Sequence, residues 1–463
     1  MEPIVSVEQM RAIDAAAPEP VEVLIDRAGA AVARAAIDLM GGAYGRTVNV
    51  IAGPGNNGFD GRVAADRLAR RGVRARVIEA AMRPPILPPA DLVIDAAYGT
   101  GFRGEWVAPD IGGARVLAVD VPSGLDAATG AAAPGVLRAD QTITFQAHKP
   151  GLLLGRGPEL VGDVIVADIG LDVSSAIMHR LEPCDVGAWW PNRQLDAHKW
   201  RGAVRAVAGS ASMQGAAWLA SRAALRSGAG IVSLTTPGGR LAAPPEVIAD
   251  GVDPAELVTS VLGGIARFGS LLIGPGLGRD DDVLTATRQL IAEGPLPAVI
   301  DGDAIFACAW SAEGAGPLLR ERHRPTVLTP HDGEFRQLTG APAGVDRLAA
   351  VRNAADESGA TILLKGPTTI VAGPATADGP GETFLVDHGD DRLATPGSGD
   401  VLAGMVAAAL ANGADPTRGA AAAAWLHAAA ARRGPREGLV ASDLIDAIPP
   451  ALAECRVASA VTR

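Results

Sequence analysis

Two glycine-rich segments of different design are the parts of this sequence best suited to bind phosphate. The first, Gly-Pro-Gly-Asn-Asn-Gly-Phe-Asp-Gly, occupies residues 53–61, and the second, Thr-Pro-Gly-Ser-Gly-Asp, occupies residues 395–400. Each lies between an apolar run typical of a strand and a segment typical of a helix, so loop N–H groups and a helix N-terminus should face one point. The chain is therefore predicted to carry two separate sites for phosphate-bearing ligands.

Two acidic loops accompany the first glycine loop. Asp95 ends an apolar run before Gly-Thr-Gly-Phe-Arg-Gly, and Asp120 ends another before Val-Pro-Ser-Gly-Leu-Asp. Ligands of open α/β sheets bind beyond the carboxyl ends of the strands, so we expect these three loops to converge. Oxygen atoms of Asn57, Asp95 and Ser123 would then suit a hard cation. For each aspartate alone, a helix cap or a turn remains the alternative.

The second glycine loop places Asp400 in the first turn of a predicted helix. There the helix N-terminus would stabilise developing negative charge and the carboxylate would accept a hydroxyl proton, a geometry that suits phosphoryl transfer. The alternative for Asp400 alone is an acid that favours a helix start. His331, three residues before Glu334, fits a helix cap and a substrate contact equally well.

Composition narrows the class of protein. The 463 residues are enough for two domains with separate cores. A net charge of -11 and an aromatic content of 3% argue against nucleic acid as the main partner. The three cysteines are too widely separated for a disulfide framework or a metal cluster. Neither a signal peptide nor an apolar run of membrane length is evident, so we expect a soluble cytoplasmic protein with no membrane partner.

Lysine is almost absent from the chain. Only Lys149, Lys199 and Lys365 occur among 41 basic residues, and the rest are arginine. Lysine differs from arginine in presenting a compact charge with rotatable donors. All three lie in motif-like loops, which favours a chemical role for the set, although chance retention is the alternative for any one of them.

Short apolar runs alternate with helical segments through both halves of the chain. This pattern predicts two α/β domains with parallel sheets, each a three-layer α/β/α sandwich. The predicted strands span residues 47–52, 76–79, 92–96, 116–119, 142–145 and 164–167, then 204–208, 231–235, 271–273, 298–300, 327–328, 362–364, 369–371 and 384–386. Helices are expected over residues 61–71, 401–411, 417–432 and 442–452. A change in composition over residues 183–199 places the predicted domains at residues 1–190 and 191–463.

Taken together, the motifs of the first half resemble the NAD(P)H-hydrate epimerase domain over residues 5–175. They are Gly-Asn-Asn-Gly-x-Asp-Gly at 55–61, Asp-Ala-x-x-Gly-Thr-Gly at 95–101, Val-Asp-Val-Pro-Ser-Gly-Leu-Asp at 119–126 and Lys-Pro-Gly-Leu at 149–152. The resemblance implies a Rossmann-like fold, K⁺ bound by Asn57, Asp95 and Ser123, and Asp120 as the acid/base group. It also implies that the hydrated dinucleotide contacts Asn56, Asn57, Gly58, Phe59, Asp60, Gly99, Thr100, Gly101, Phe102, Arg103, Gly104, Glu105 and Asp120.

Phe59 departs from this family pattern, which has glycine at the same place. If the position requires a positive φ, a bulky side chain is strained there. The phenyl ring could also fill the space of the phosphate. Because the rest of the motif is complete, we expect a ring that is turned aside and an epimerase that works, although more slowly.

The second half resembles the ADP-dependent NAD(P)H-hydrate dehydratase domain of the ribokinase-like superfamily over residues 192–455. The resemblance implies that ADP or ATP, with Mg²⁺, is bound by Lys365, Gly366, Pro367, Thr368, Thr369 and Gly399. It implies that the hydrate contacts Ala216, Gly276, Gly278, His331 and Asp400, with Asp400 catalytic. Four positions depart from the family pattern, none of them a reacting group: Trp200 and Pro396 where glycine is usual, Gly302 where alanine is usual, and Asp332 where proline is usual.

An epimerase domain followed by a dehydratase domain resembles the bifunctional NAD(P)H-hydrate repair enzymes. The expected partners are a dinucleotide substrate and an adenine nucleotide, and a homo-oligomer is expected. One alternative is a ribokinase-type kinase of a vitamin alcohol with a catalytically silent first domain. Another is a non-enzymatic dinucleotide sensor joined to a degenerate scaffold. The sequence leaves open the choices between ADP and ATP and between NADH and NADPH.

Overall fold

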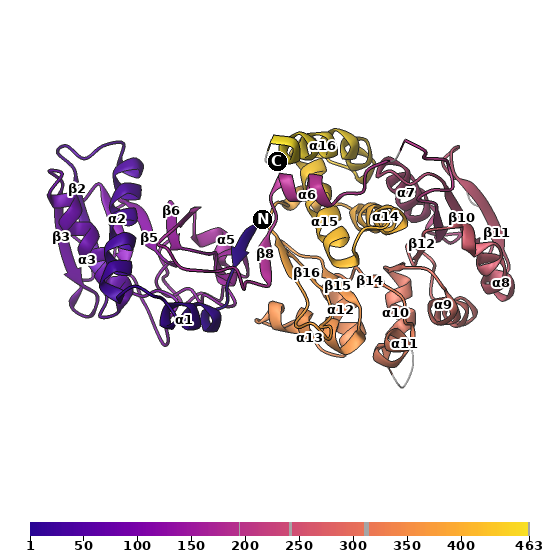
Figure 1. The fold of residues 1–463 in the computed structure, drawn as a ribbon, viewed down its shortest axis with the longest axis horizontal. Coiled ribbons are helices and arrows are strands. Elements are labelled where there is room, and N and C mark those ends of the chain that lie inside the picture. Colours follow the sequence, from indigo (N-terminus) through magenta and orange to yellow (C-terminus); the bar gives the residue numbers. More distant parts are fainter. Residues whose placement is uncertain (194, 240–242, 310–313, 462–463) are drawn as a thin grey trace. The chain divides into compact units, whose positions relative to one another are not determined.

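The computed structural model describes residues 1–193, 195–239, 243–309 and 314–461, and it forms two compact units (Figure 1). The first unit spans residues 2–178, and the second spans residues 179–463 together with Met1. The division therefore lies before the predicted boundary at 190/191. The reason is helix α6 (Pro183–Trp189), which packs on α16 (Ala441–Val461) of the second unit. A Cβ at Gly187 would lie 2.1 Å from the Cys455 carbonyl oxygen, so this contact requires glycine.

The first unit contains a sheet of six parallel strands. Their order across the sheet is β3 (Arg74–Glu79), β2 (Thr47–Ala52), β4 (Leu92–Ala96), β5 (Arg115–Val119), β6 (Gln141–Phe145) and β7 (Asp163–Ala167). The chain passes from β2 outward to β3 and then returns to the other side of β2 at β4. The carboxyl ends of β2 and β4 therefore form a topological switch point, where open α/β sheets bind their ligands.

Two long helices cover one face of this sheet. They are α2 (Val21–Met40) and α3 (Asn56–Ala69), which pack on each other and on the central strands. Val50 and Ile94 point to this face, whereas Ile51 and Val93 point to the opposite one. The opposite face is covered by the short helix η1 (Ala80–Met82) and by loops that contain Trp106. The remaining elements of the unit are β1 (Glu2–Ile4), α1 (Val7–Ala15), α4 (Pro150–Leu153) and α5 (Gly157–Leu160).

The sheet of the second unit is larger. Its order is β8 (Met178–Arg180), β17 (Thr383–Val386), β16 (Thr369–Ala372), β15 (Thr361–Leu364), β14 (Thr326–Leu328), β13 (Ala298–Ile300), β12 (Ser270–Ile273), β9 (Val204–Val207), β10 (Val232–Pro237) and β11 (Ile248–Val252). The strands from β15 to β11 are parallel, and β16 is antiparallel to both of its neighbours β15 and β17. The loops after β12, β13, β14 and β15 consequently open at one edge of the sheet.

Helices cover both faces of the second sheet, as expected for a three-layer α/β/α unit (Figure 1). One layer contains α6, α7 (Gln214–Arg226), α14 (Ser398–Ala411), α15 (Pro416–Arg433) and α16. The other layer contains α8 (Leu257–Leu262), α9 (Asp281–Glu293), α10 (Asp303–Ala309), α11 (Ala315–Glu321), α12 (Asp332–Thr339) and α13 (Arg347–Ser358). Every residue of α14 from Val401 to Leu410 is buried, which identifies α14 as the central helix of the core.

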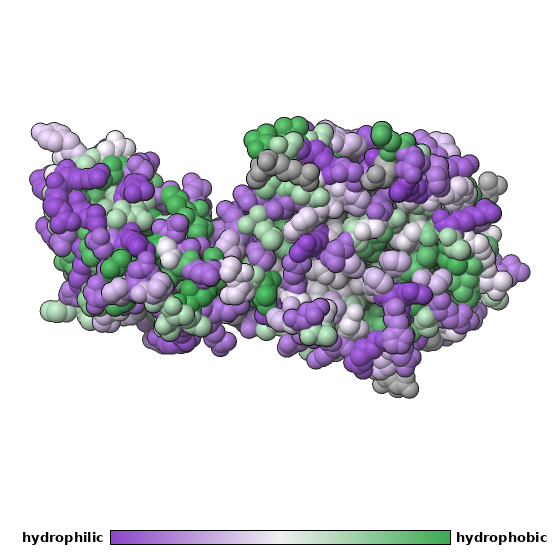
Figure 2. Space-filling view, viewed as in Figure 1, coloured by the Kyte–Doolittle hydropathy of each residue, from purple (hydrophilic) through white to green (hydrophobic). Residues whose placement is uncertain are grey.

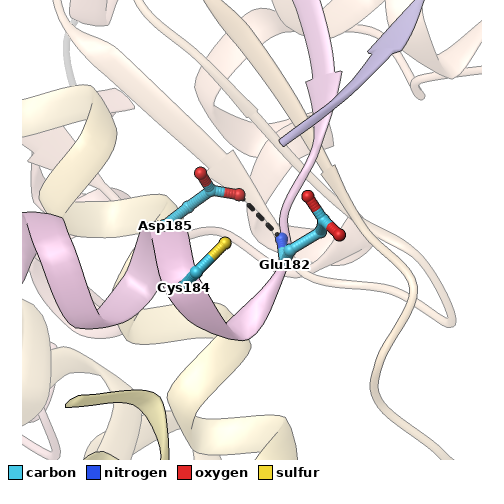
Figure 3. Close-up of side chains that lie close together, drawn as sticks. All are labelled: Glu182, Cys184 and Asp185. Atoms are coloured by element: carbon cyan, nitrogen blue, oxygen red, sulfur yellow. Dashed lines mark hydrogen bonds between the residues drawn. The ribbon is translucent and has the colours of Figure 1, made fainter. Parts of the chain in front are cut away.

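An acidic cluster at the start of α6 has a structural explanation (Figure 3). Figure 3 shows the Asp185 carboxylate turned toward the backbone nitrogen of Glu182, which donates a hydrogen bond to it at 3.0 Å. The N-terminal amine of Met1 pairs with both carboxylates, at 3.0 Å from Glu182 and 2.7 Å from Asp185. These contacts cap the N-terminus of the helix, where unpaired N–H groups favour negative charge.

The visible surface is mostly polar, with apolar residues in small groups between charged ones (Figure 2). Among the residues that the structure describes, no helix combines the length and the hydropathy needed to cross a bilayer.

Candidate functional sites

A cavity of about 590 Å³ opens at the switch point of the first unit. The three loops that the sequence predicted to converge all contribute to it, at residues 54–57, 97–102 and 120. Its chemically active lining consists of Asp14, Asn56, Asn57, Asp60, Gly99, Thr100, Gly101, Asp120 and Lys149. The volume is within the range of small-molecule sites, and most of the functional groups come from loops at strand ends.

Asp120 directly follows β5 and has a positive φ of 67°. Left-handed backbone is uncommon outside glycine and is found mainly where the surroundings enforce it, often at active sites. Its Oδ2 accepts a hydrogen bond from the Thr100 N–H at 3.0 Å. Its Oδ1 lies 2.9 Å from Lys149 Nζ and 3.2 Å from Thr144 Oγ1. The predicted acid/base group is thus held by contacts on both oxygens while it lines the cavity.

Lys149 is a site residue whose role the sequence analysis did not identify. Its side chain is 1% exposed, and its ammonium group also donates to Thr144 Oγ1 at 2.8 Å and to the Phe145 carbonyl oxygen at 3.0 Å. A buried ammonium is stable only when its hydrogen bonds and its charge are both matched. The signal that could have found it is the scarcity of lysine, because Lys149 is one of only three in the chain.

Asp60 lies on α3 with its residue surface 6% exposed. Among the described residues its carboxyl group forms neither a hydrogen bond nor an ion pair, and it lines the same cavity as Asp120. Burial, followed by the nearby negative charges of Asp120 and Asp14, raises the pKa of Asp60 to about 8. Asp60 and Asp120 therefore differ in their electrostatic surroundings.

Of the three residues predicted to bind K⁺, Asp95 and Ser123 contact each other directly, and Asn57 lines the cavity. Asp95 is fully buried, and its carboxylate accepts hydrogen bonds from Ser123 Oγ at 2.6 Å and from the Ser123 N–H at 2.9 Å. Burial raises the pKa of Asp95 above its ordinary value. The side-chain oxygen and nitrogen of Asn57 are both buried without a hydrogen-bond partner. A buried carboxylate and a buried amide oxygen without a partner are both ligand types that suit a hard cation.

The ring of Phe59 is turned away from the cavity. It is 46% exposed, lies under the Arg62 guanidinium at 5.7 Å, and does not line the cavity. Helix α3 begins at Asn56, earlier than the predicted helix at residue 61, so Phe59 has helical backbone. The positive φ considered for this position is absent, and the concern about backbone strain was wrong. Gly58 needs to be glycine, because its Cβ would lie 1.9 Å from the Gly53 carbonyl oxygen.

The loop over residues 99–105 is only partly in the cavity. Gly99, Thr100, Gly101 and Phe102 line it, whereas Arg103, Gly104 and Glu105 do not. Contacts of those last three residues with a substrate remain predictions.

The second site forms where β12, β13, β14 and β15 end and α14 begins. Lys365 follows β15, and its Nζ lies 3.0 Å from Asp301 Oδ1 and 3.8 Å from Glu334 Oε2. A Cβ on Gly399, in the first turn of α14, would lie 3.3 Å from the same Nζ. The Lys365 ammonium group therefore lies next to the N-terminus of α14. A positive charge and a helix N-terminus both favour phosphate, so this point is suited to bind an anion. Asp301 and Glu334 had not been assigned to the site from the sequence.

Asp400 occupies the first turn of α14, one residue after Gly399. Burial and the charges of Asp301, Glu334 and Asp303 raise the pKa of Asp400 to about 7, and Lys365 partly opposes that rise. A carboxyl group with this pKa releases and takes up a proton near neutral pH, as a general acid/base requires.

His331 caps helix α12. Its Nδ1 accepts a hydrogen bond from the Glu334 N–H at 3.1 Å, and the Glu334 carboxylate accepts one from the His331 N–H at 2.9 Å. This reciprocal pair is a capping box. The imidazole is nevertheless 61% exposed, so the cap leaves its edge accessible. The predicted contact of His331 with the hydrate remains a prediction.

Other residues predicted to contact the hydrate lie in two small groups. Ala216 on α7 packs against Gly276, whose Cβ would lie 2.8 Å from the alanine Cβ. The Gly278 N–H donates to Asp303 Oδ2 at 2.9 Å. The chain thus brings Ala216 and Gly276 into contact and holds the following glycine turn through Asp303.

The predicted nucleotide loop borders a small cavity. Gly366, Pro367 and Thr369 line it together with apolar side chains and with His427 of α15. Thr368 is 6% exposed and does not line this cavity. His427 Nε2 is buried and has no hydrogen-bond partner in the described part of the chain, and burial lowers the pKa of His427 to about 4.

Three of the departures from the family pattern can be described from their local contacts or backbone. Asp332 is the first residue of α12, where a negative charge is favourable, and it forms a 2.6 Å ion pair with Arg347. Gly302 has a φ of 53°, which glycine adopts without strain. Trp200 packs edge-on against Phe268, with ring centroids 5.8 Å apart.

Known proteins match the chain over nearly its whole length. The family model described as NAD(P)H-hydrate dehydratase matches residues 204–450, and the model described as YjeF-related protein N-terminus matches residues 21–90 and 78–151. Proteins named bifunctional NAD(P)H-hydrate repair enzyme are similar throughout. The one from Moorella thermoacetica is 33% identical over 93% of this chain and 92% of its own, and the one from Gloeobacter violaceus is 36% identical over 92% and 91%.

Solved structures match the second unit. A ribokinase-like superfamily protein from Enterococcus faecalis is 25% identical with a TM-score of 0.52, and it covers 60% of this chain and 96% of its own. A second match is the ADP/ATP-dependent NAD(P)H-hydrate dehydratase from Bacillus subtilis, co-crystallized with ATP/Mg²⁺. It is 26% identical with a TM-score of 0.50, and the match covers 60% of this chain and 98% of its own. With its two glycine-loop sites on two α/β units in this order, the chain belongs to the family of bifunctional NAD(P)H-hydrate repair enzymes.

Proposed function

We propose that this protein restores NADH and NADPH that have gained water across a double bond of the nicotinamide ring. The first unit interconverts the R and S epimers of the hydrate. The second unit removes water from the S epimer at the expense of an adenine nucleotide. The observation that carries the proposal is the grouping of Lys365, Asp400 and the N-terminus of α14, which combines a phosphate site with a titrating carboxyl group.

In the second unit, nucleotide phosphates would lie against Lys365 and the N-terminal turn of α14. Mg²⁺ bound with the nucleotide would neutralise part of the phosphate charge. Asp400 takes the proton of the ring hydroxyl as the hydroxyl oxygen attacks the terminal phosphorus. Phosphate is a better leaving group than hydroxide, so the carbon–oxygen bond of the resulting ester breaks and phosphate leaves. The neighbouring ring carbon then loses a proton to the departing phosphate or to water, and the electron pair of that carbon–hydrogen bond restores the ring double bond. The pKa of Asp400 is about 7, which lets its carboxylate act as the base near neutral pH.

In the first unit, the hydrated ring would occupy the cavity at the switch point. The substrate carbon bears both a hydroxyl group and the ring nitrogen, so exchanging the two epimers requires proton transfers at these substituents. The support for Asp120 in this role is that it lines the cavity and is held there by Thr100 and Lys149.

K⁺ is part of the proposal for this unit. Asn57, Asp95 and Ser123 would hold it, and its charge would organise the loops that carry Asp120 and the phosphate contacts. The support is the buried Asp95 carboxylate, which Ser123 contacts, together with the buried amide of Asn57, which has no hydrogen-bond partner among the described residues. The cytoplasm as location and a homo-oligomeric state remain predictions from the sequence, and the choice between ADP and ATP stays open.

The test is incubation of the purified protein with hydrated NADH and ADP or ATP. Recovery of the NADH absorbance together with release of phosphate supports repair. A stable phosphorylated alcohol and no recovered NADH would instead support the vitamin kinase, which the similarity over both units does not favour.

A further inference from the structure

The cavity of the first unit contains two carboxyl groups in opposite surroundings. Asp60 lies in the second turn of α3, and Asp120 lies at the end of β5. Both line the cavity, and both are at most 9% exposed. Two carboxyl groups whose surroundings differ are the usual basis for separate acid and base roles in one site.

Asp120 is the member of the pair that is held by an ion pair and a hydrogen bond. Its Oδ1 lies 2.9 Å from the ammonium group of Lys149, and its Oδ2 accepts a backbone hydrogen bond from Thr100. Lys149 is itself fixed by Thr144 and by the Phe145 carbonyl oxygen. An ion-paired carboxylate with fixed orientation is suited to accept a proton.

Asp60 is the neutral member of the pair. It has no hydrogen bond or ion pair within the described part of the chain, although it is 6% exposed. A buried carboxylate without a partner is costly, and like charges nearby add to that cost. The charged groups that line the cavity with it are Asp14, Glu19, Asp120 and Lys149. Lys149 is paired with Asp120, so Asp60 is left beside carboxylates, in line with a pKa raised to about 8.

We propose that Asp60 gives a proton to the leaving hydroxyl of the hydrated nicotinamide and that Asp120 takes a proton from the water that replaces it. This inference rests on the proposed epimerase function. The Asp60 proton moves to the hydroxyl oxygen, the carbon–oxygen bond breaks, and water leaves. The lone pair of the ring nitrogen forms a carbon–nitrogen double bond. Water then adds to the opposite face of that carbon and loses a proton to Asp120.

The two carboxyl groups have exchanged protonation states at the end of this sequence. A proton returned from Asp120 to Asp60, directly or through water in the cavity, resets the site. Atoms and charge balance, because one water leaves and one water enters. The competing role for Asp60 is a simple hydrogen bond to the substrate, which an asparagine could also provide.

The experiment follows the conversion of one purified epimer of hydrated NADH into the other, with no nucleotide present so that the second unit does not dehydrate it. Asp60→Asn preserves shape and hydrogen bonding but cannot transfer a proton. We expect kcat to fall at least about a hundredfold, as for loss of a general acid, with KM close to that of the wild type. Asp66→Asn is the matched control, because Asp66 is exposed on the same helix, and it should retain the wild-type kcat.

A second measurement needs no variant. In water enriched in ¹⁸O, the wild-type enzyme should place one solvent oxygen in the hydrate for each epimer converted, above the uncatalysed background. Conversion without ¹⁸O would overturn the inference, as would an Asp60→Asn variant within tenfold of the wild type. If the wild type converts neither epimer while ADP-dependent dehydration proceeds, the epimerase function itself is wrong and the inference falls with it.

Discussion

The Nζ of Lys365 lies 3.0 Å from Oδ1 of Asp301, two residues at the ends of different strands of the second sheet. The same oxygen of Asp301 accepts a hydrogen bond from Thr329 Oγ1 at 2.7 Å. Although burial opposes the charged form, the carboxylates of Asp301 and Glu334 raise the pKa of Lys365 above its ordinary value. The proposed nucleotide site therefore has a lysine whose position is fixed by Asp301 and whose charged form is favoured by Asp301 and Glu334.

Asp400→Asn should lower dehydration by roughly two to four decades, the usual cost of losing a general base. The variant is nearly isosteric, so folding and ADP affinity should stay close to those of the wild type. Turnover of the S hydrate is measured beside calorimetric ADP binding. A rate within tenfold of the wild type would remove Asp400 from the mechanism.

The dehydration rate should also follow the ionisation of Asp400. Its pKa is raised to about 7, so the carboxylate that accepts the hydroxyl proton predominates above that pH and disappears below it. We expect kcat/KM for the S hydrate to fall about tenfold per pH unit below 7, since this ratio reports groups of the free enzyme. The same profile for Asp400→Asn should lack this acid limb. An acid limb that persists in the variant would assign the titration to another group.

Lys365→Ala should weaken ADP binding by about ten- to a hundredfold, the range for loss of a charged hydrogen bond. Lys199→Ala is the matched control, because Lys199 is exposed, and it should bind ADP as the wild type does. Asp301→Asn should weaken binding less, and adding it to Lys365→Ala should cost little more, because both changes act through one contact. Calorimetric affinity beside thermal unfolding checks this, and fully additive losses would mean that Asp301 acts independently of Lys365.

Phe59→Gly should change epimerisation only modestly, because the ring is turned out of the cavity. Glycine also destabilises the first turns of α3 by up to about 1 kcal/mol relative to alanine, so Phe59→Ala separates removal of the ring from the backbone effect. Both variants are compared with the wild type on the unfavoured epimer. If the wild type is inactive and Phe59→Gly gains conversion, the ring blocks the site and this protein has lost its epimerase.

The strands of both sheets were largely predictable, because buried parallel strands are short apolar runs bounded by polar turns. Residues 92–96 and 298–300 match β4 and β13 without change. The start of α3 was missed because Asn56, Asn57 and Gly58 are poor helix formers that are tolerated only in a first turn. The compact units divide before the predicted boundary because α6, although short, packs on the distant α16.

The motifs indicated Asp60, Asp95, Asp120 and Asp400 as candidate site residues, but neither Asp301 nor the contacts that hold these side chains. The pairing of Lys149 with Asp120 depends on how the ends of β5 and β6 lie together. The pairing of Lys365 with Asp301 likewise requires β13, β14 and β15 to be neighbours. The outward orientation of the Phe59 ring follows from the helical backbone of α3. The residue type alone does not predict this orientation.

The most direct test starts from a mixture of the R and S hydrates of NADH, with ADP or ATP in excess. Repair by both units predicts that the whole mixture returns to NADH, with one phosphate released for each NADH formed. The S epimer should disappear first, and the R epimer should follow faster than its uncatalysed conversion. No recovery of NADH from the S epimer, in the presence of either nucleotide, would contradict the account.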